Sequence, residues 1–120
     1  MSRFTARVPS DLRTIRLRVG RKLAAAGCTA EGIDDTLVML SELMTNALLH
    51  AGSEARVHLL IAAGRVRVTV CDTSGEAPVV RPLDAERVGG NGLRIVQALA
   101  DDWGASSLGS GKEVWFERSC

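Results

Sequence analysis

The chain has little that would place it in a membrane or on nucleic acid. None of its apolar runs approaches the roughly 18 residues that a membrane-spanning helix needs. Residues 1–9 contain no apolar core of a secretory signal. The formal net charge is only +1, and Lys and Arg alternate with Asp and Glu, which argues against a nucleic-acid-binding face. We therefore expect neither a membrane segment nor direct contact with nucleic acid.

Cysteine and histidine are scarce as well. The three cysteines, Cys28, Cys71 and Cys120, are odd in number and show no CxxC spacing. The two histidines, His50 and His58, have no Cys or His at ligand spacing. A disulfide scaffold and a zinc site are therefore not expected. Three reduced cysteines in a cytoplasmic protein are the simplest interpretation.

Several common catalytic and nucleotide-binding motifs are missing. Glu113 stands where a P-loop, after its Gly-Lys pair, needs Ser or Thr. Residues 90–92 (GNG) lack the third glycine of a dinucleotide fingerprint and follow a long loop instead of a strand. No nucleophile-elbow pattern supports a Ser-His-Asp triad.

The chain does contain enough apolar material for one folded domain. Apolar residues make up 46% of its 120 residues, so we expect a single domain spanning residues 1–120. Periodicity predicts strand, helix, helix, strand, strand, helix, strand and strand, in that order. Their approximate ranges are 4–8, 10–26 with Ser10 as the N-cap, 29–52, 57–61, 66–70, 92–103 with Trp103 facing inward and Gly104 as the stop, 105–108 and 112–118.

Short turns between adjacent strands, such as Ala63-Gly64, indicate a largely antiparallel sheet. We therefore predict an α+β fold, a two-layer α/β sandwich with helices on one face of a mixed, mostly antiparallel sheet.

A carboxylate and an amide lie one turn apart on the second predicted helix. Glu42 and Asn46 are four residues apart and hence neighbours on one helical face. They belong to a partly polar stripe with Met39 and His50. A carboxylate can accept a proton or position a water, and an amide oxygen can ligate Mg²⁺. Alone, the pair would mean little.

Two later features extend this pattern. Asp72 ends an apolar strand, where its carboxylate either caps a turn or accepts the exocyclic amine of adenine. The glycine-rich residues 89–92 precede a helix, as a flexible turn or as a loop whose backbone N–H groups approach phosphates. Residues 73–90 show no clear period, which is typical of a functional lid. Together with Glu42 and Asn46, these features favour a nucleotide site.

The same segments resemble the GHKL ATPase superfamily, which uses the Bergerat nucleotide-binding fold. SELMTNALLHAG (41–52) is similar to its N-box, and VCDTSG (70–75) and GGNGLRIVQALADDWG (89–104) are similar to its two G-boxes. GKEVWFE (111–117) resembles its last strand. Within the superfamily, the chain looks most like bacterial anti-sigma-factor serine/threonine kinases and their actinobacterial ATP-binding relatives.

This resemblance implies that ATP and Mg²⁺ are the ligands. Glu42 would be the general base, Asn46 the Mg²⁺ ligand and Asp72 the partner of the adenine amine. Residues 73–87 would form the ATP lid. The remaining nucleotide-binding positions would be Gly75, Gly90, Asn91, Gly92, Leu93 and His50, although His50 is equally well explained as a structural histidine.

The implied function is a protein kinase that phosphorylates an anti-sigma-factor antagonist and sequesters a sigma factor, with homodimerisation as a further expectation. Two departures motivate an alternative. Glu76 stands where the superfamily often has glycine, and Glu113 stands where a threonine commonly helps to bind adenine. A carboxylate near the base would weaken binding. The alternative is therefore a nucleotide-binding or nucleotide-independent regulatory interaction module without kinase activity. A third interpretation is an unrelated α+β domain.

Overall fold

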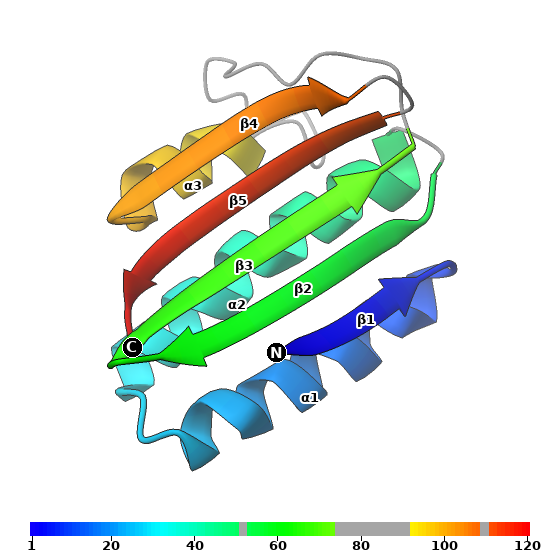
Figure 1. The fold of residues 1–120 in the computed structure, drawn as a ribbon. Helices are drawn as coiled ribbons and strands as arrows, with labels where there is room; N and C mark the ends of the chain where they lie inside the picture. Colours follow the sequence, from blue (N-terminus) through cyan, green and yellow to red (C-terminus); the bar gives the residue numbers. More distant parts are fainter. Residues whose placement is uncertain (51–52, 74–91, 109–110) are drawn as a thin grey trace.

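A computed structural model describes residues 1–50, 53–73, 92–108 and 111–120, with the backbone alone at His50 and Leu108. Its helices all cover one face of a five-stranded sheet (Figure 1). The elements are β1 (Ser2–Ala6), α1 (Pro9–Ala25), α2 (Ala30–Thr45), the π-helix η1 (Asn46–His50), β2 (Ala55–Ala62), β3 (Arg65–Asp72), α3 (Gly92–Leu99), β4 (Asp102–Leu108) and β5 (Gly111–Ser119). The predicted α+β class and the predicted element order are confirmed.

The sheet has the strand order β1-β2-β3-β5-β4, and all four neighbouring pairs are antiparallel. The mixed sheet that the sequence indicated is therefore wholly antiparallel among the described strands. After β3 the chain crosses to the sheet edge at β4 and returns as β5 between them. This crossover places the end of β3 beside the beginning of β5, so that Asp72 is opposite Lys112.

The core lies between the inner face of the sheet and the helices. Alternate strand residues point inward, as the period of two requires. Met39, which the sequence pattern placed on the partly polar stripe, is fully buried, so the apolar face of α2 is broader than predicted. The main core residues are Val57, Leu59, Val66, Val68, Val70, Val114 and Phe116 from strands and Ile15, Val19, Leu23, Met39, Leu40, Leu43, Met44 and Val96 from helices.

The first helix begins two residues earlier than predicted. Its N-cap is Val8, not Ser10, and Pro9 occupies the first turn, where a missing N–H costs nothing. The Asp11 carboxylate accepts hydrogen bonds from the backbone N–H groups of Arg7 (2.8 Å) and Val8 (3.1 Å). These two bonds lower the pKa of the Asp11 carboxyl group, and the bond from Arg7 has the larger effect. The Asp11 side chain, three residues after the cap, thus binds the N–H groups of the two residues that precede the helix, as in the second half of a capping box.

Two other local predictions are confirmed. The Thr29 hydroxyl accepts a hydrogen bond from the Gly32 N–H (3.0 Å) and caps α2. Ala63 and Gly64 both have positive φ, 53° and 72°, which is the geometry of the predicted two-residue hairpin. No helix in the described ranges is long and apolar enough to cross a membrane.

The end of the third helix was predicted wrongly. α3 ends at Leu99, and both Trp103 and Gly104 belong to β4. Gly104 pairs with Trp115, and a Cβ on Gly104 would lie 2.5 Å from the indole Nε1. Glycine is therefore needed there to admit the indole across the hairpin, not to stop a helix.

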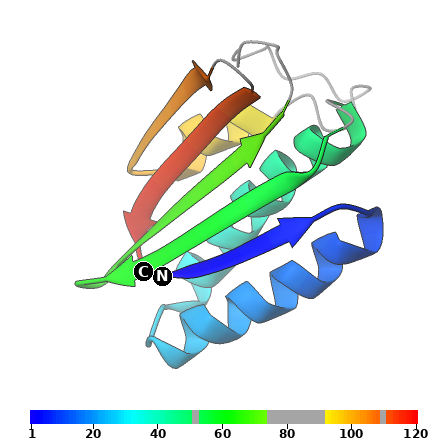
Figure 2. The same ribbon diagram turned by 45° about the vertical axis from the view of Figure 1, so that its right-hand side comes forward.

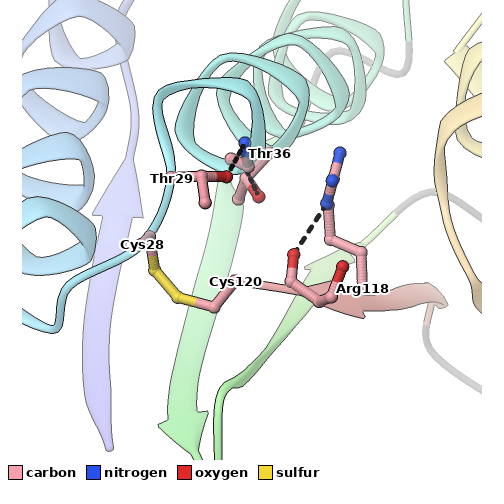
Figure 3. Close-up of a disulfide and its surroundings, with 7 residues drawn as sticks. Cys28, Thr29, Thr36, Arg118 and Cys120 are labelled. Carbon is pink, nitrogen blue, oxygen red and sulfur yellow. Dashed lines mark hydrogen bonds between the residues drawn. A yellow bond between two sulfur atoms is a disulfide. The ribbon is translucent and has the colours of Figure 1, made fainter.

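A disulfide joins Cys28 and Cys120, contrary to the prediction of three reduced cysteines (Figure 3). It connects the α1–α2 turn to the residue after β5, across a sequence separation of 92 and a Cα–Cα distance of 4.5 Å. The absent side chain of Gly32 allows this approach, because a Cβ there would lie 3.0 Å from the Cys120 backbone. Cys71 remains a free thiol.

Candidate functional site

The predicted acid and amide lie where α2 changes into η1. The Asn46 N–H bonds to the carbonyls of Glu42 and Leu43, which places Asn46 one turn beyond Glu42, as predicted. Both side chains are half-buried. Among the described residues, the Glu42 carboxylate has no hydrogen-bonded or ion-paired partner. Short π-helical segments within or beside α-helices frequently occur at functional sites.

The start of α3 lies directly against Asn46. A Cβ on Gly92 would be 2.3 Å from the Asn46 side-chain nitrogen and 3.6 Å from the Glu42 carbonyl oxygen. A side chain at position 92 would therefore displace the Asn46 amide. The first N–H groups of a helix lack intrahelical partners and favour anions. The structure thus brings Glu42, Asn46 and Gly92 together, three residues that the sequence assigned to one site.

Leu93, also predicted to contribute to the nucleotide site, is 8% exposed and packs in the core. Any contact with a nucleotide would therefore use its backbone N–H.

Asp72 lies at the same end of the molecule, where β3 ends and β5 begins (Figure 1). Its side chain is only 5% exposed, and its Oδ2 lies 3.8 Å from Nζ of Lys112, whose side chain is 18% exposed. The backbone passes closely here, because a Cβ on Gly111 would clash with the Asp72 carbonyl oxygen. The Thr73 N–H donates to the Ser53 hydroxyl (2.9 Å), which ties the end of β3 to the segment that follows η1. Figure 2 shows the ribbon at this end of the molecule after a turn of 45° about the vertical axis.

The family resemblance implied that Glu113 lies near the adenine base that Asp72 binds, but the structure does not place Glu113 opposite Asp72. Glu113 is paired with Cys71, and Lys112 is paired with Asp72. Since neighbouring strand residues point to opposite faces, Glu113 and Cys71 are on the face without helices. Burial, and then the Glu113 carboxylate, raise the pKa of the Cys71 thiol. The cation Lys112, which the sequence analysis missed, occupies the position by the carboxylate.

Part of the predicted site lies outside the described residues. This applies to Gly75, Gly90 and Asn91, to Glu76, and to the proposed lid except Thr73. His50 closes η1, and its side chain is not described.

The donors that the structure does place suit a hard cation. Within the described ranges, no group of three or more His, Cys, Asp and Glu side chains could hold a metal. An amide oxygen such as that of Asn46 suits Mg²⁺, which is usually bound through one or two protein ligands together with substrate phosphates. The residues present therefore fit this ion with a nucleotide.

The chain belongs to the histidine kinase-like ATPase domain family, whose sequence model matches residues 4–118. This membership confirms the resemblance to the GHKL superfamily. A similar solved structure is the crystal structure of the RsbU and RsbW domains of Rv1364c from Mycobacterium tuberculosis, with a TM-score of 0.69 and 17% identity. The match covers 99% of this chain and 32% of that one, and at this identity it shows the fold alone. No curated protein matches the chain.

Proposed function

We propose that the chain is an ATP- and Mg²⁺-dependent serine/threonine protein kinase that phosphorylates an anti-sigma-factor antagonist and sequesters a sigma factor. Its membership of the histidine kinase-like ATPase family supports this proposal. So does the resemblance of residues 41–52, 70–75 and 89–104 to anti-sigma-factor kinases. The observation that carries the proposal is the packing of Asn46 against Gly92, one turn beyond Glu42. We further propose that the protein forms a homodimer. The Cys28–Cys120 disulfide removes the cysteine argument for a cytoplasmic location.

Three residues bind and orient the nucleotide in this proposal. The buried carboxylate of Asp72 accepts a hydrogen bond from the exocyclic amine of adenine. The N-terminal N–H groups of α3, from Gly92 onward, face the phosphates. The Asn46 side-chain oxygen ligates Mg²⁺, which, when bound, neutralises charge on the phosphates.

Glu42 is the proposed general base. Its carboxylate accepts the proton of the partner's hydroxyl group as the hydroxyl oxygen bonds to the γ-phosphorus. The bond from that phosphorus to the β–γ bridging oxygen breaks, and ADP leaves with the electron pair. Phosphoryl transfer depends mainly on positioning and charge neutralisation. The close packing of Gly92 against the Asn46 side chain, one turn beyond Glu42, supports this proposal.

Two measurements test this function. Saturating Mg·ADP should raise the melting temperature, because a ligand at 100 times its Kd stabilises the folded state by about 2.7 kcal/mol. Glu42→Ala should then abolish transfer of labelled γ-phosphate from ATP to a candidate antagonist while keeping the Mg·ADP effect. The control is Glu31→Ala, an exposed carboxylate in the first turn of α2, which should transfer at the wild-type rate.

The outcomes separate the competing functions. Transfer by Glu42→Ala would remove Glu42 from the mechanism. Stabilisation by Mg·ADP without any transfer by the wild type would favour the interaction module, and no effect of Mg·ADP would remove the nucleotide site. One motive for that module is already gone, because Glu113 lies on the opposite face of the sheet from Asp72.

A further inference from the structure

Lys112 lies on the side of the sheet where a nucleotide base would bind. It is directly opposite Asp72 in the β3–β5 register, two residues beyond the pair of Val70 and Val114. Because side chains alternate between faces, Lys112 and Asp72 share the inner face with these two buried valines. Directly opposed residues have Cβ atoms about 5 Å apart, so their side-chain ends meet at one small ligand edge.

The Lys112 ammonium is an enclosed donor with unused capacity. It carries three N–H donors and no acceptor. Its distance of 3.8 Å from the Asp72 carboxylate makes an ion pair but is too long for a direct hydrogen bond. Across the described ranges, the ammonium makes no hydrogen bond, and its side chain is only 18% exposed. Donors enclosed in this way gain from an added acceptor.

Adenine presents the complementary pair of groups. Its exocyclic amine is a donor, and the adjacent ring nitrogen, N1, is an acceptor. A carboxylate beside an ammonium presents acceptor and donor in the matching order. When the amine donates to Asp72, N1 therefore faces toward Lys112.

We propose that Lys112 is a second base-recognition residue, whose ammonium donates a hydrogen bond to N1 of adenine while Asp72 accepts from the exocyclic amine. This inference rests on the proposed nucleotide-binding function. It assigns a contact with the base to Lys112, which lies opposite Asp72 where the sequence analysis had expected Glu113. No bond forms or breaks at Lys112, so its effect is on affinity and base selectivity.

Calorimetry with two nucleotides tests the assignment. ADP and 1-deaza-ADP, in which a C–H group replaces N1, are titrated with Mg²⁺ into the wild type and into Lys112→Met, which keeps the aliphatic length without the charge. The wild type should bind ADP about 10- to 100-fold more tightly than 1-deaza-ADP, the scale of a charged hydrogen bond. In Lys112→Met, ADP affinity should fall until the two nucleotides bind nearly equally.

Arg67→Met is the matched control. Arg67 is a cation of the same strand pair, and it binds Glu117 (2.8 Å) on the opposite face of the sheet. The Arg67→Met variant should prefer ADP over 1-deaza-ADP as strongly as the wild type does. An unchanged preference in Lys112→Met would reduce Lys112 to a structural ion-pair partner. Tighter ADP binding by Lys112→Met would show that Lys112 competes with the base. Either result overturns the inference but leaves the kinase proposal intact, whereas a wild type that binds neither nucleotide overturns both.

Discussion

Gly92→Ala should displace the Asn46 amide while leaving the stability of the fold almost unchanged. The added Cβ would lie 2.3 Å from the Asn46 side-chain nitrogen, whereas ordinary contact begins at 3.4 Å. The amide must therefore move by roughly 1 Å, and a misplacement of that size can cost about 100-fold in rate. The obstructing atom ends a flexible side chain, and alanine is a better helix former than glycine. The free energy of unfolding should consequently change by less than about 1 kcal/mol.

The assay compares ADP affinity in Mg²⁺ and in EDTA, together with phosphotransfer and melting temperature. In Gly92→Ala, the Mg²⁺-dependent part of the affinity should be lost and transfer should fall by about 100-fold. Asn46→Ala should show the same loss, and the double variant should lose no more, because both changes act on one contact. Gly20→Ala is the control, since its Cβ would meet Leu37 at an ordinary 3.5 Å. Unaltered Mg²⁺ dependence in Gly92→Ala would refute the assignment of Asn46 as the metal ligand.

Three further predictions concern the cysteines and the open face of the sheet. Cys28→Ser should lower the free energy of unfolding by about 2–5 kcal/mol in denaturant titrations, and dithiothreitol should do the same to the wild type, because the disulfide closes a long loop. The rate at which iodoacetamide alkylates Cys71 increases with pH, and the midpoint of this increase should lie at higher pH in the folded chain than in the unfolded chain. Because folding raises the pKa of Cys71, the neutral thiol contributes to the free energy of unfolding below the pKa that the thiol has in the unfolded chain. This contribution is lost as the pH rises through the pKa of the folded chain. Glu113→Thr should move that alkylation midpoint to lower pH and leave ADP affinity unchanged.

The order of elements could be predicted because local patterns specify it. Alternation marked β2 and β3, the Ala63-Gly64 turn marked their hairpin, and Thr29 marked the start of α2. The end of α3 was missed because residues 100–104 fit a helical pattern when considered alone. Residues 102–104 are extended because they pair with β5, and this pairing depends on residues 115–117, which are distant from them in the sequence.

The disulfide could not be predicted for a similar reason. Cys28 and Cys120 are separated by 92 residues and belong to no spacing motif. They meet because α2 and β5 pack together at the end of the sheet away from Asp72. The glycine at position 32 is the local feature that permits this contact, and its purpose is visible only when the backbone of Ser119 and Cys120 is placed against it. Composition therefore gave the wrong state for two of the three cysteines.

The site itself was predictable where its residues lie on one helix and not where it spans two strands. Glu42 and Asn46 needed only the helical repeat. The partner of Asp72 depended on strand parity, and an error of one residue moves a side chain to the other face. The buried residues Val114 and Phe116 already indicated that even-numbered positions of β5 point inward, which selects Lys112 and excludes Glu113. Applying this alternation before assigning motif positions would have placed a cation, not an anion, beside the carboxylate. Among the described residues, the proposed base pocket therefore pairs the Asp72 carboxylate with the Lys112 cation, which removes the electrostatic objection to nucleotide binding that Glu113 had raised.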